Sequence, residues 1–120
     1  MTERDRFKKG SLEMLLLKIL SEHDCYGYQI TQIIKNVTNG IIVVREPSMY
    51  PILYRLQDKG YISSYVKRGC GRLERVYYHL EKDGLEELNQ LMSVYHEVHR
   101  GIEAILNYSA IEDGVKEVNQ

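Results

Sequence analysis

The sequence lacks most of the features that identify a secreted protein or a membrane protein. It has no tryptophan, and its two cysteines, Cys25 and Cys70, lie far apart and outside any CxxC motif. This cysteine usage predicts a reducing compartment and no disulfide framework. No apolar run is long enough to cross a membrane, and the N-terminal segment MTERDRFKKG has no signal-peptide pattern. We therefore expect a cytoplasmic protein with no membrane partner.

Enzyme motifs are missing as well. The chain has no HExxH, no P-loop and no GxSxG, and nothing in it resembles a set of nucleophile, base and orienting residue. We expect no catalytic residues, no bound metal and no cofactor. Two weaker hypotheses stay open: a metal-sensing role for His96 and His99, and a redox-sensing thiol at Cys70.

Charge is distributed unevenly along the chain, although the net charge is only −1. Residues 1–80 contain 13 Lys and Arg against 8 Asp and Glu, whereas residues 81–120 contain 3 against 9. A basic front and an acidic rear make a polar molecule, whose front could neutralise phosphates.

A short amphipathic helix is predicted near the middle of the chain. Its apolar residues fall at i, i+3, i+4 and i+7: Met49, Ile52, Leu53 and Leu56. Ser48 is expected to be its N-cap, Pro51 fits near its start, and Gly60 is expected to end it with a positive φ.

The opposite face of this helix carries Tyr50, Tyr54, Arg55 and Asp58. Tyrosine hydroxyls and arginine can bond phosphate oxygens, and arginine can also bond a guanine edge. The alternative is an ordinary solvated helix face.

The segment after the helix reads as a β-hairpin, which we call the wing. Apolar and polar residues alternate with a period of two over residues 61–67 and 75–80, and Gly69 and Gly71 lie between these runs. The basic residues of the wing are Lys67, Arg68, Arg72 and Arg75. A helix followed by a basic hairpin is typical of a winged helix, which predicts a mainly α fold with a small antiparallel β-sheet. A basic loop can also be only a solvated turn.

Two helices are predicted ahead of this unit. The first has an apolar stripe that is wide enough for burial on two sides: Leu12, Leu15, Leu16, Ile19 and Leu20. The second begins near Tyr26–Tyr28 and ends at Thr38–Gly40. The β-branched run Ile41–Val44 is expected to be the third strand of the sheet.

A long helix is predicted from about Lys82 to about Asn107. Its apolar residues form a heptad seam with spacings of three and four: Leu85, Leu88, Met92, Tyr95, His99, Ile102 and Leu106. We expect this seam to form a homodimer, with Leu12 and Leu16 of the first helix packed alongside; the alternative is a helix that folds back on its own domain. The predicted organisation is a DNA-binding domain over 1–80, a dimerisation helix over 81–107 and a polar acidic tail over 108–120.

The order of these segments resembles the PadR family of bacterial transcriptional regulators, over about residues 10–106. The resemblance rests on YGYQI, PSMYPILYRLQDKGYI, the basic wing and RVYYHLEKDGLEEL taken together. It implies a homodimeric winged-helix repressor of the compact subfamily, which binds a pseudo-palindromic double-stranded DNA operator. By this resemblance, Tyr50, Tyr54 and Arg55 match the recognition helix, Arg68 and Arg72 the wing, and Tyr26 and Tyr28 the start of the second helix. Together with Ser48 and the further basic wing residues Lys67 and Arg75, these are the candidate DNA-binding residues.

The resemblance also implies release from DNA by a small aromatic or hydrophobic compound in some members. Some compact members line a pore with tryptophan, which this chain lacks. The candidate ligand-binding residues here are Leu15, Ile19, Met92, Tyr95, His96 and His99. The alternative for Tyr95 and His99 is that they are packed or set the register of the heptad seam. Two alternatives stay open: a winged helix that binds protein instead of DNA, and a ligand sensor in which DNA contact is secondary.

Overall fold

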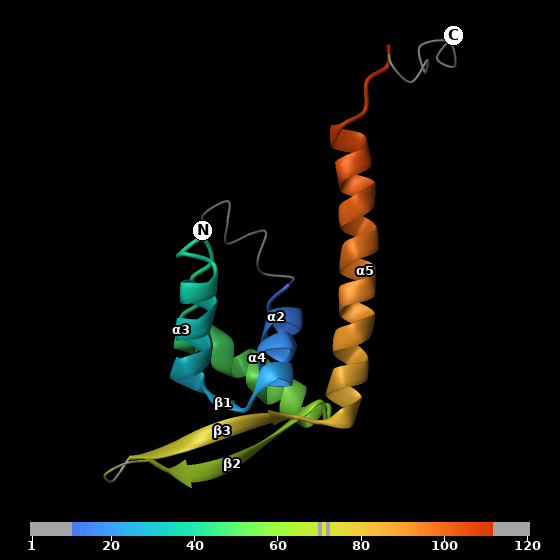
Figure 1. The fold of residues 1–120 in the computed structure, drawn as a ribbon. Coiled ribbons are helices and arrows are strands. Elements are labelled where there is room, and N and C mark those ends of the chain that lie inside the picture. The colour runs from blue at the N-terminus through green and yellow to red at the C-terminus, as the bar shows by residue number, and fades with distance from the viewer. Residues whose placement is uncertain (1–10, 70, 72, 112–120) are drawn as a thin grey trace. The chain divides into compact units, whose positions relative to one another are not determined.

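The computed structural model describes residues 11–69, 71 and 73–111 (Figure 1). The chain divides into two units, one up to Asn89 and one from Gln90 onward. Cys70, Arg72 and the tail beyond Ile111 lie outside the described residues. The described elements are α2 (Leu12–Glu22), β1 (Cys25–Tyr26), α3 (Gly27–Val37), α4 (Glu46–Asp58), β2 (Ile62–Arg68), β3 (Glu74–Leu80) and α5 (Lys82–Leu106).

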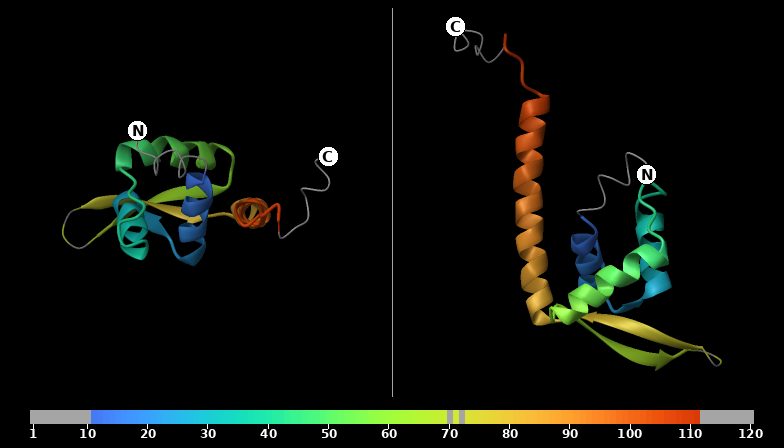
Figure 2. Two further views of the ribbon diagram at one scale, coloured as in Figure 1. Left: turned by 90° about the horizontal axis from the view of Figure 1, so that it is seen from above. Right: turned by 180° about the vertical axis from the view of Figure 1, so that it is seen from behind.

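The sheet is antiparallel with the order β1-β3-β2, so the predicted hairpin is confirmed. Ile62 pairs with Leu80 at the base of the hairpin, and Arg68 pairs with Glu74 near its tip. Figure 2 shows the tip of this hairpin projecting beyond α2, α3 and α4. The wing is therefore a two-stranded arm whose outer half is exposed to solvent.

The third strand is not the predicted one. Cys25–Tyr26 pairs with Tyr77–Tyr78 of β3, whereas Ile41–Val44 forms an irregular connection between α3 and α4. The Thr38 hydroxyl and carbonyl accept the N–H groups of Ile42 and Ile41, at 3.1 and 3.0 Å. These N–H groups are therefore used in a local turn, and the β-branched run contributes only Val44 to the core.

The core of the first unit is formed by α2, α3 and α4 against the base of the sheet. Its largest fully buried side chains are Leu16, Leu17, Ile30, Met49, Leu53, Leu56 and Ile62. The expectation that Leu12 and Leu16 lie in a dimer interface is wrong, because both are buried within their own chain, Leu16 completely. Leu12, Leu16, Leu17 and Leu20 of this helix are buried within its own domain, whereas Leu15 and Ile19 are only half-buried.

Helix α4 begins earlier than predicted. Arg45 is its N-cap and Glu46 its first residue, so Ser48 lies inside the first turn and is exposed. Pro47 explains the earlier start, because a proline at the second helical position lacks only an N–H that has no partner in the helix. The predicted end is confirmed: Gly60 has a φ of +78° and follows the last turn.

Helix α5 agrees with its predicted bounds to within about one residue, and its first turns belong to the first unit. Gly84 is buried, and a Cβ there would collide with the carbonyl oxygen of Tyr61. Leu88 is only 2% exposed. The expectation that Leu88 contacts a partner chain is therefore wrong, because this side chain is packed within its own unit.

Candidate nucleic-acid interface

The crossing of α3 and α4 depends on a glycine. Gly27, the first residue of α3, lies so close to Tyr50 that an added Cβ would collide with the phenol oxygen. That oxygen donates a hydrogen bond of 2.8 Å to the carboxylate of Glu46. Burial, followed by this hydrogen bond, raises the pKa of Tyr50 to about 12. Tyr50 is therefore a part-buried packing residue between the two helices, which differs from the expectation that it faces DNA.

The outward face of α4 carries six exposed residues: Pro47, Ser48, Pro51, Tyr54, Arg55 and Asp58. Tyr54 is 56% exposed, and its ring stacks on that of Tyr50 with the centroids 6.1 Å apart. The inner tyrosine thus supports the outer one. This face offers hydroxyl groups, apolar surface and one guanidinium, all of which can contact base edges or phosphates.

Arg55 is not free on this face. Its Nη2 lies 3.4 Å from Oε1 of Glu13 on α2. Helical spacing in the sequence placed Arg55 on the outward face but gave no signal for a partner that lies 42 residues away. The guanidinium is held toward α2 by a carboxylate that would compete with a phosphate.

A cleft of about 370 Å³ separates α4 from the wing. Across it, Nε2 of Gln57 donates a hydrogen bond of 3.0 Å to Oγ of Ser64. The residues that line the cleft are Tyr54, Gln57, Asp58, Ser64, Val76 and Tyr78. Helix and wing therefore form two walls of one neutral to weakly acidic cleft, with the basic residues farther out along the strands.

The basic residues of the wing lie on two faces of the hairpin. Arg68 pairs with Glu74 of the opposite strand at 3.2 Å, and both side chains are exposed. Lys67 and Arg75 are paired across the strands on the other face. Arg72 lies outside the described residues. Tyr28, at the start of α3, is exposed, and Tyr26 just before it lies part-buried on the sheet.

Asp24 connects the wing to the turn between α2 and α3, and no pattern in the sequence indicates this role. Its carboxylate accepts a hydrogen bond of 2.7 Å from the Tyr65 hydroxyl and lies 2.8 Å from Nδ1 of His79. Burial alone would raise the pKa of Asp24, but the hydrogen bonds from Tyr65 and His79 outweigh it and lower this pKa.

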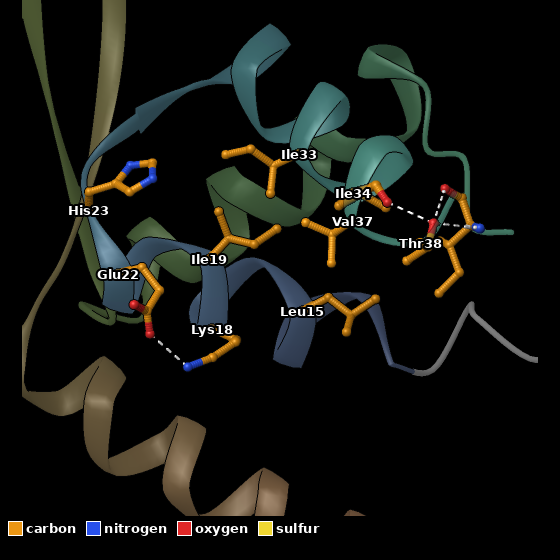
Figure 3. A pocket seen from close by; sticks show the side chains of 10 residues that line it. Leu15, Lys18, Ile19, Glu22, His23, Ile33, Ile34, Val37 and Thr38 are labelled. Carbon is orange, nitrogen blue, oxygen red and sulfur yellow. Dashed lines mark hydrogen bonds and ion pairs between the residues drawn. The ribbon is translucent and has the colours of Figure 1, made fainter. Parts of the chain in front are cut away.

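Two of the predicted ligand-binding residues line an apolar groove between α2 and α3 (Figure 3). The groove has a volume of about 310 Å³. The Lys18–Glu22 ion pair, 2.7 Å long, lies at its rim. Its apolar walls are Leu15 and Ile19 from one side and Ile33, Ile34, Val37 and Ile42 from the other. Helix α3 thus supplies the second wall within the first unit, whereas the sequence had suggested α5 residues.

The other predicted ligand-binding residues belong to the second unit. There Tyr95 stacks on His99 at 5.8 Å and meets His96 edge-on at 5.3 Å. Within the described part of the chain, no three His, Cys, Asp or Glu side chains are close enough together to hold a metal ion. None of the described helices is long and apolar enough to span a membrane.

Comparison with known proteins agrees with this architecture. Residues 16–90 match the model of the Transcriptional regulator PadR-like family. The chain belongs to this family. A PadR-like transcriptional regulator from Bacillus cereus is 30% identical, with a TM-score of 0.76 over 87% of this chain and 99% of that one.

Two further comparisons are informative. An uncharacterized protein of Lysinibacillus sphaericus is 31% identical over 98 residues, which cover 82% of this chain and 90% of that protein. Bacillus subtilis PadR, solved in complex with operator DNA, is 27% identical with a TM-score of 0.62. The match to it covers 68% of this chain and 46% of that one. The fold is a PadR winged helix.

Proposed function

We propose that this PadR-family protein is a homodimeric transcriptional repressor that binds a pseudo-palindromic DNA operator. The observation that carries the proposal is the exposed outward face of α4 beside a projecting wing with exposed basic side chains at Lys67 and Arg68. Its likeness to Bacillus subtilis PadR, which was solved in complex with operator DNA, supports DNA as the partner of this chain.

In this proposal α4 enters the major groove and the wing lies along the phosphate backbone. Ser48, Tyr54 and Arg55 contact base edges or phosphates, and Tyr28 adds a backbone contact at the start of α3. Tyr50 acts indirectly, because it supports the ring of Tyr54 from behind. Phosphate contacts fix the position on the duplex, whereas base contacts select the sequence.

Dimerisation is proposed to use the heptad seam of α5 beyond Gln90. Tyr95 and Ile102 are 45% and 50% exposed, and Leu106 is exposed as well. A helix with such an exposed apolar stripe is favoured to pair with a second copy of itself. A two-fold dimer would present its two α4 helices to half-sites roughly 34–36 Å apart.

Release by a small apolar compound is the second part of the proposal. The apolar groove beside Leu15 and Ile19 is a candidate site, and Met92, Tyr95, His96 and His99 of α5 remain candidates in the dimer. Titration of aromatic compounds into the protein–DNA complex, followed by fluorescence anisotropy, tests this part. Loss of anisotropy at compound concentrations that leave the protein folded is the expected result.

Selection of bound duplexes from a random-sequence pool tests DNA recognition without assuming which gene is regulated. We expect enrichment of an inverted repeat, whose binding weakens steeply with salt because phosphate contacts release counterions. Tyr54→Ala is expected to weaken binding to the selected site, and Tyr108→Ala, at a tyrosine of similar exposure in the second unit, is the matched control. Failure to enrich any sequence with a folded dimer would reject the repressor proposal in favour of a protein-binding winged helix.

A further inference from the structure

The face of the sheet turned away from α4 carries an ordered set of aromatic and basic side chains. We call it the outer sheet face and define it by Tyr26, Tyr65, Lys67, Arg75 and Tyr77. Cross-strand pairing places Tyr65 and Tyr26 opposite Tyr77, and Lys67 opposite Arg75. Since residues paired across strands project to the same side, these five side chains share one face.

Three tyrosine rings form a continuous layer on this face. Tyr65 stacks on Tyr77 with the centroids 5.7 Å apart and the planes 14° apart. Tyr26 meets Tyr77 edge-on, with the centroids 5.4 Å apart. Both contacts are within the range of favourable aromatic pairs. The layer is anchored at one end, because the Tyr65 hydroxyl donates to Asp24 at 2.7 Å.

Each cation of the outer sheet face lies over one of these rings. Nζ of Lys67 is 5.4 Å from the centroid of Tyr77, and Cζ of Arg75 is 4.4 Å from the centroid of Tyr26. A cation at such distances is attracted by the electron density of the ring face. Lysine and arginine side chains are otherwise long and flexible, so the rings restrict where the two charges lie.

Lys67 and Arg75 are also direct partners in the ladder between β2 and β3, and like charges in such a pair destabilise a sheet. No carboxylate of the described residues forms a salt bridge with Lys67 or Arg75. Glu74, the acidic residue of the hairpin, pairs with Arg68 instead. A bound anion between the two cations would relieve their repulsion.

We infer that Lys67 and Arg75 form a clamp for one DNA phosphate, and that Tyr77 and Tyr26 are positioning residues that hold the two cations in place. The inference rests on the proposed DNA-binding function and adds to it a defined anion site on the wing. Arginine contributes a planar fork of donors and lysine a compact charge, which together can contact two oxygens of the same phosphate.

A double-mutant cycle on DNA affinity tests the clamp. Lys67→Gln is expected to lower the slope of log affinity against log salt by about 0.9, the value for one phosphate contact. Tyr77→Val is expected to weaken binding about threefold to fivefold and to leave this slope largely unchanged, because the charge remains while its cation–π contact is lost. In the Lys67→Gln background, Tyr77→Val is expected to have a clearly smaller effect, because only its edge contact with Tyr26, the ring beneath Arg75, remains to be lost.

Tyr77→Phe is the matched control, because it keeps the ring and removes only the hydroxyl. It is expected to bind like the wild type. A second cycle with Arg75→Gln and Tyr26→Val tests the other half of the clamp. If one of the two tyrosine variants does not fold, the cycle on the other tyrosine still tests the proposal. Thermal unfolding of each variant identifies any that are misfolded.

Two results would overturn the clamp: Tyr77→Val weakens binding equally with and without Lys67, or the phenylalanine variant is as defective as the valine variant. Either would mean that Tyr77 supports the wing without positioning its charge. The proposed function fails separately, when the wild-type protein itself selects no DNA sequence.

Discussion

The guanidinium of Arg55 on α4 lies 3.4 Å from the carboxylate of Glu13 in the first turn of α2. This ion pair joins the helix proposed to enter the major groove to a helix of the domain core. A phosphate or a guanine edge that takes Arg55 must displace Glu13. The carboxylate therefore lowers the net gain from any contact of Arg55 with DNA.

Glu13→Gln is expected to raise DNA affinity by up to about fivefold, because exposed ion pairs of this kind contribute about 0.2–1 kcal/mol. The measurement is fluorescence anisotropy at several salt concentrations. The control is Glu22→Gln, which removes the same charge from the same helix but breaks the Lys18–Glu22 pair. Equal gains from both variants would mean that only the net charge of the protein matters.

Gly27→Ala is expected to destabilise the fold by about 1–3 kcal/mol, the usual cost of forcing an extra methyl group into a packed site. The added Cβ would collide with the phenol ring of Tyr50, which is part-buried and whose hydroxyl is bonded to Glu46. Urea unfolding followed by circular dichroism measures the effect.

Gly101→Ala is the control for this glycine, because nothing lies within 4 Å of a Cβ added there. Alanine has the higher helix propensity, so this change is expected to stabilise α5 by up to about 1 kcal/mol. A Gly27→Ala variant as stable as the wild type would show that the Tyr50 ring can move aside at no cost.

Asp24→Asn is expected to make the stability of the protein less dependent on acid pH. Hydrogen bonds from Tyr65 and His79 lower the pKa of Asp24 in the folded protein, although burial opposes the shift. A carboxyl group with a lowered pKa stabilises the fold above its unfolded pKa, about 3.9, and this contribution is lost as pH falls through the folded pKa.

Unfolding free energies of wild type and Asp24→Asn at pH 7 and at acid pH test this expectation. The wild type should be more stable at pH 7, and the difference should shrink below about pH 4. Tyr65→Phe, which removes one of the two donors, should show part of the same trend. Parallel pH profiles for the wild type and the asparagine variant would mean that Asp24 adds no pH-dependent stability.

The sequence predicted those parts of the fold that depend on local signals. The apolar spacing around Leu53, the end of α4 at Gly60 and the alternation in the wing each report on a few consecutive residues, and the structure agrees with them. Ile41–Val44 was misassigned because β propensity cannot reveal which segment reaches the free edge of β3. Cys25–Tyr26 occupies that edge and is too short to give a pattern.

The candidate interface was less predictable for the same reason. Helical spacing predicted that Tyr54 and Arg55 lie on the outward face of α4, and both side chains are exposed there in the structure. The ion pair of Arg55 with Glu13 joins distant segments, and the contact of Tyr50 with Gly27 depends on the angle between two helices. Leu16 and Leu88 were expected to meet a partner because an apolar stripe does not say which molecule covers it.

Ile102→Glu is expected to convert the proposed dimer into a monomer and to weaken operator binding. Ile102 lies on the heptad seam and is 50% exposed in the single chain. A glutamate there would place two like charges close together at a two-fold axis, away from water, where burying an unpaired charge is costly. Analytical ultracentrifugation measures the mass of the variant.

Ala104→Glu is the matched control, because it introduces the same charge two residues away, on the opposite side of α5. It should remain dimeric and bind DNA like the wild type. A monomeric Ile102→Glu variant that still binds the full operator tightly would separate dimerisation from recognition, because one α4 helix would then suffice. A dimeric Ile102→Glu variant would remove the seam beyond Gln90 from the proposed interface.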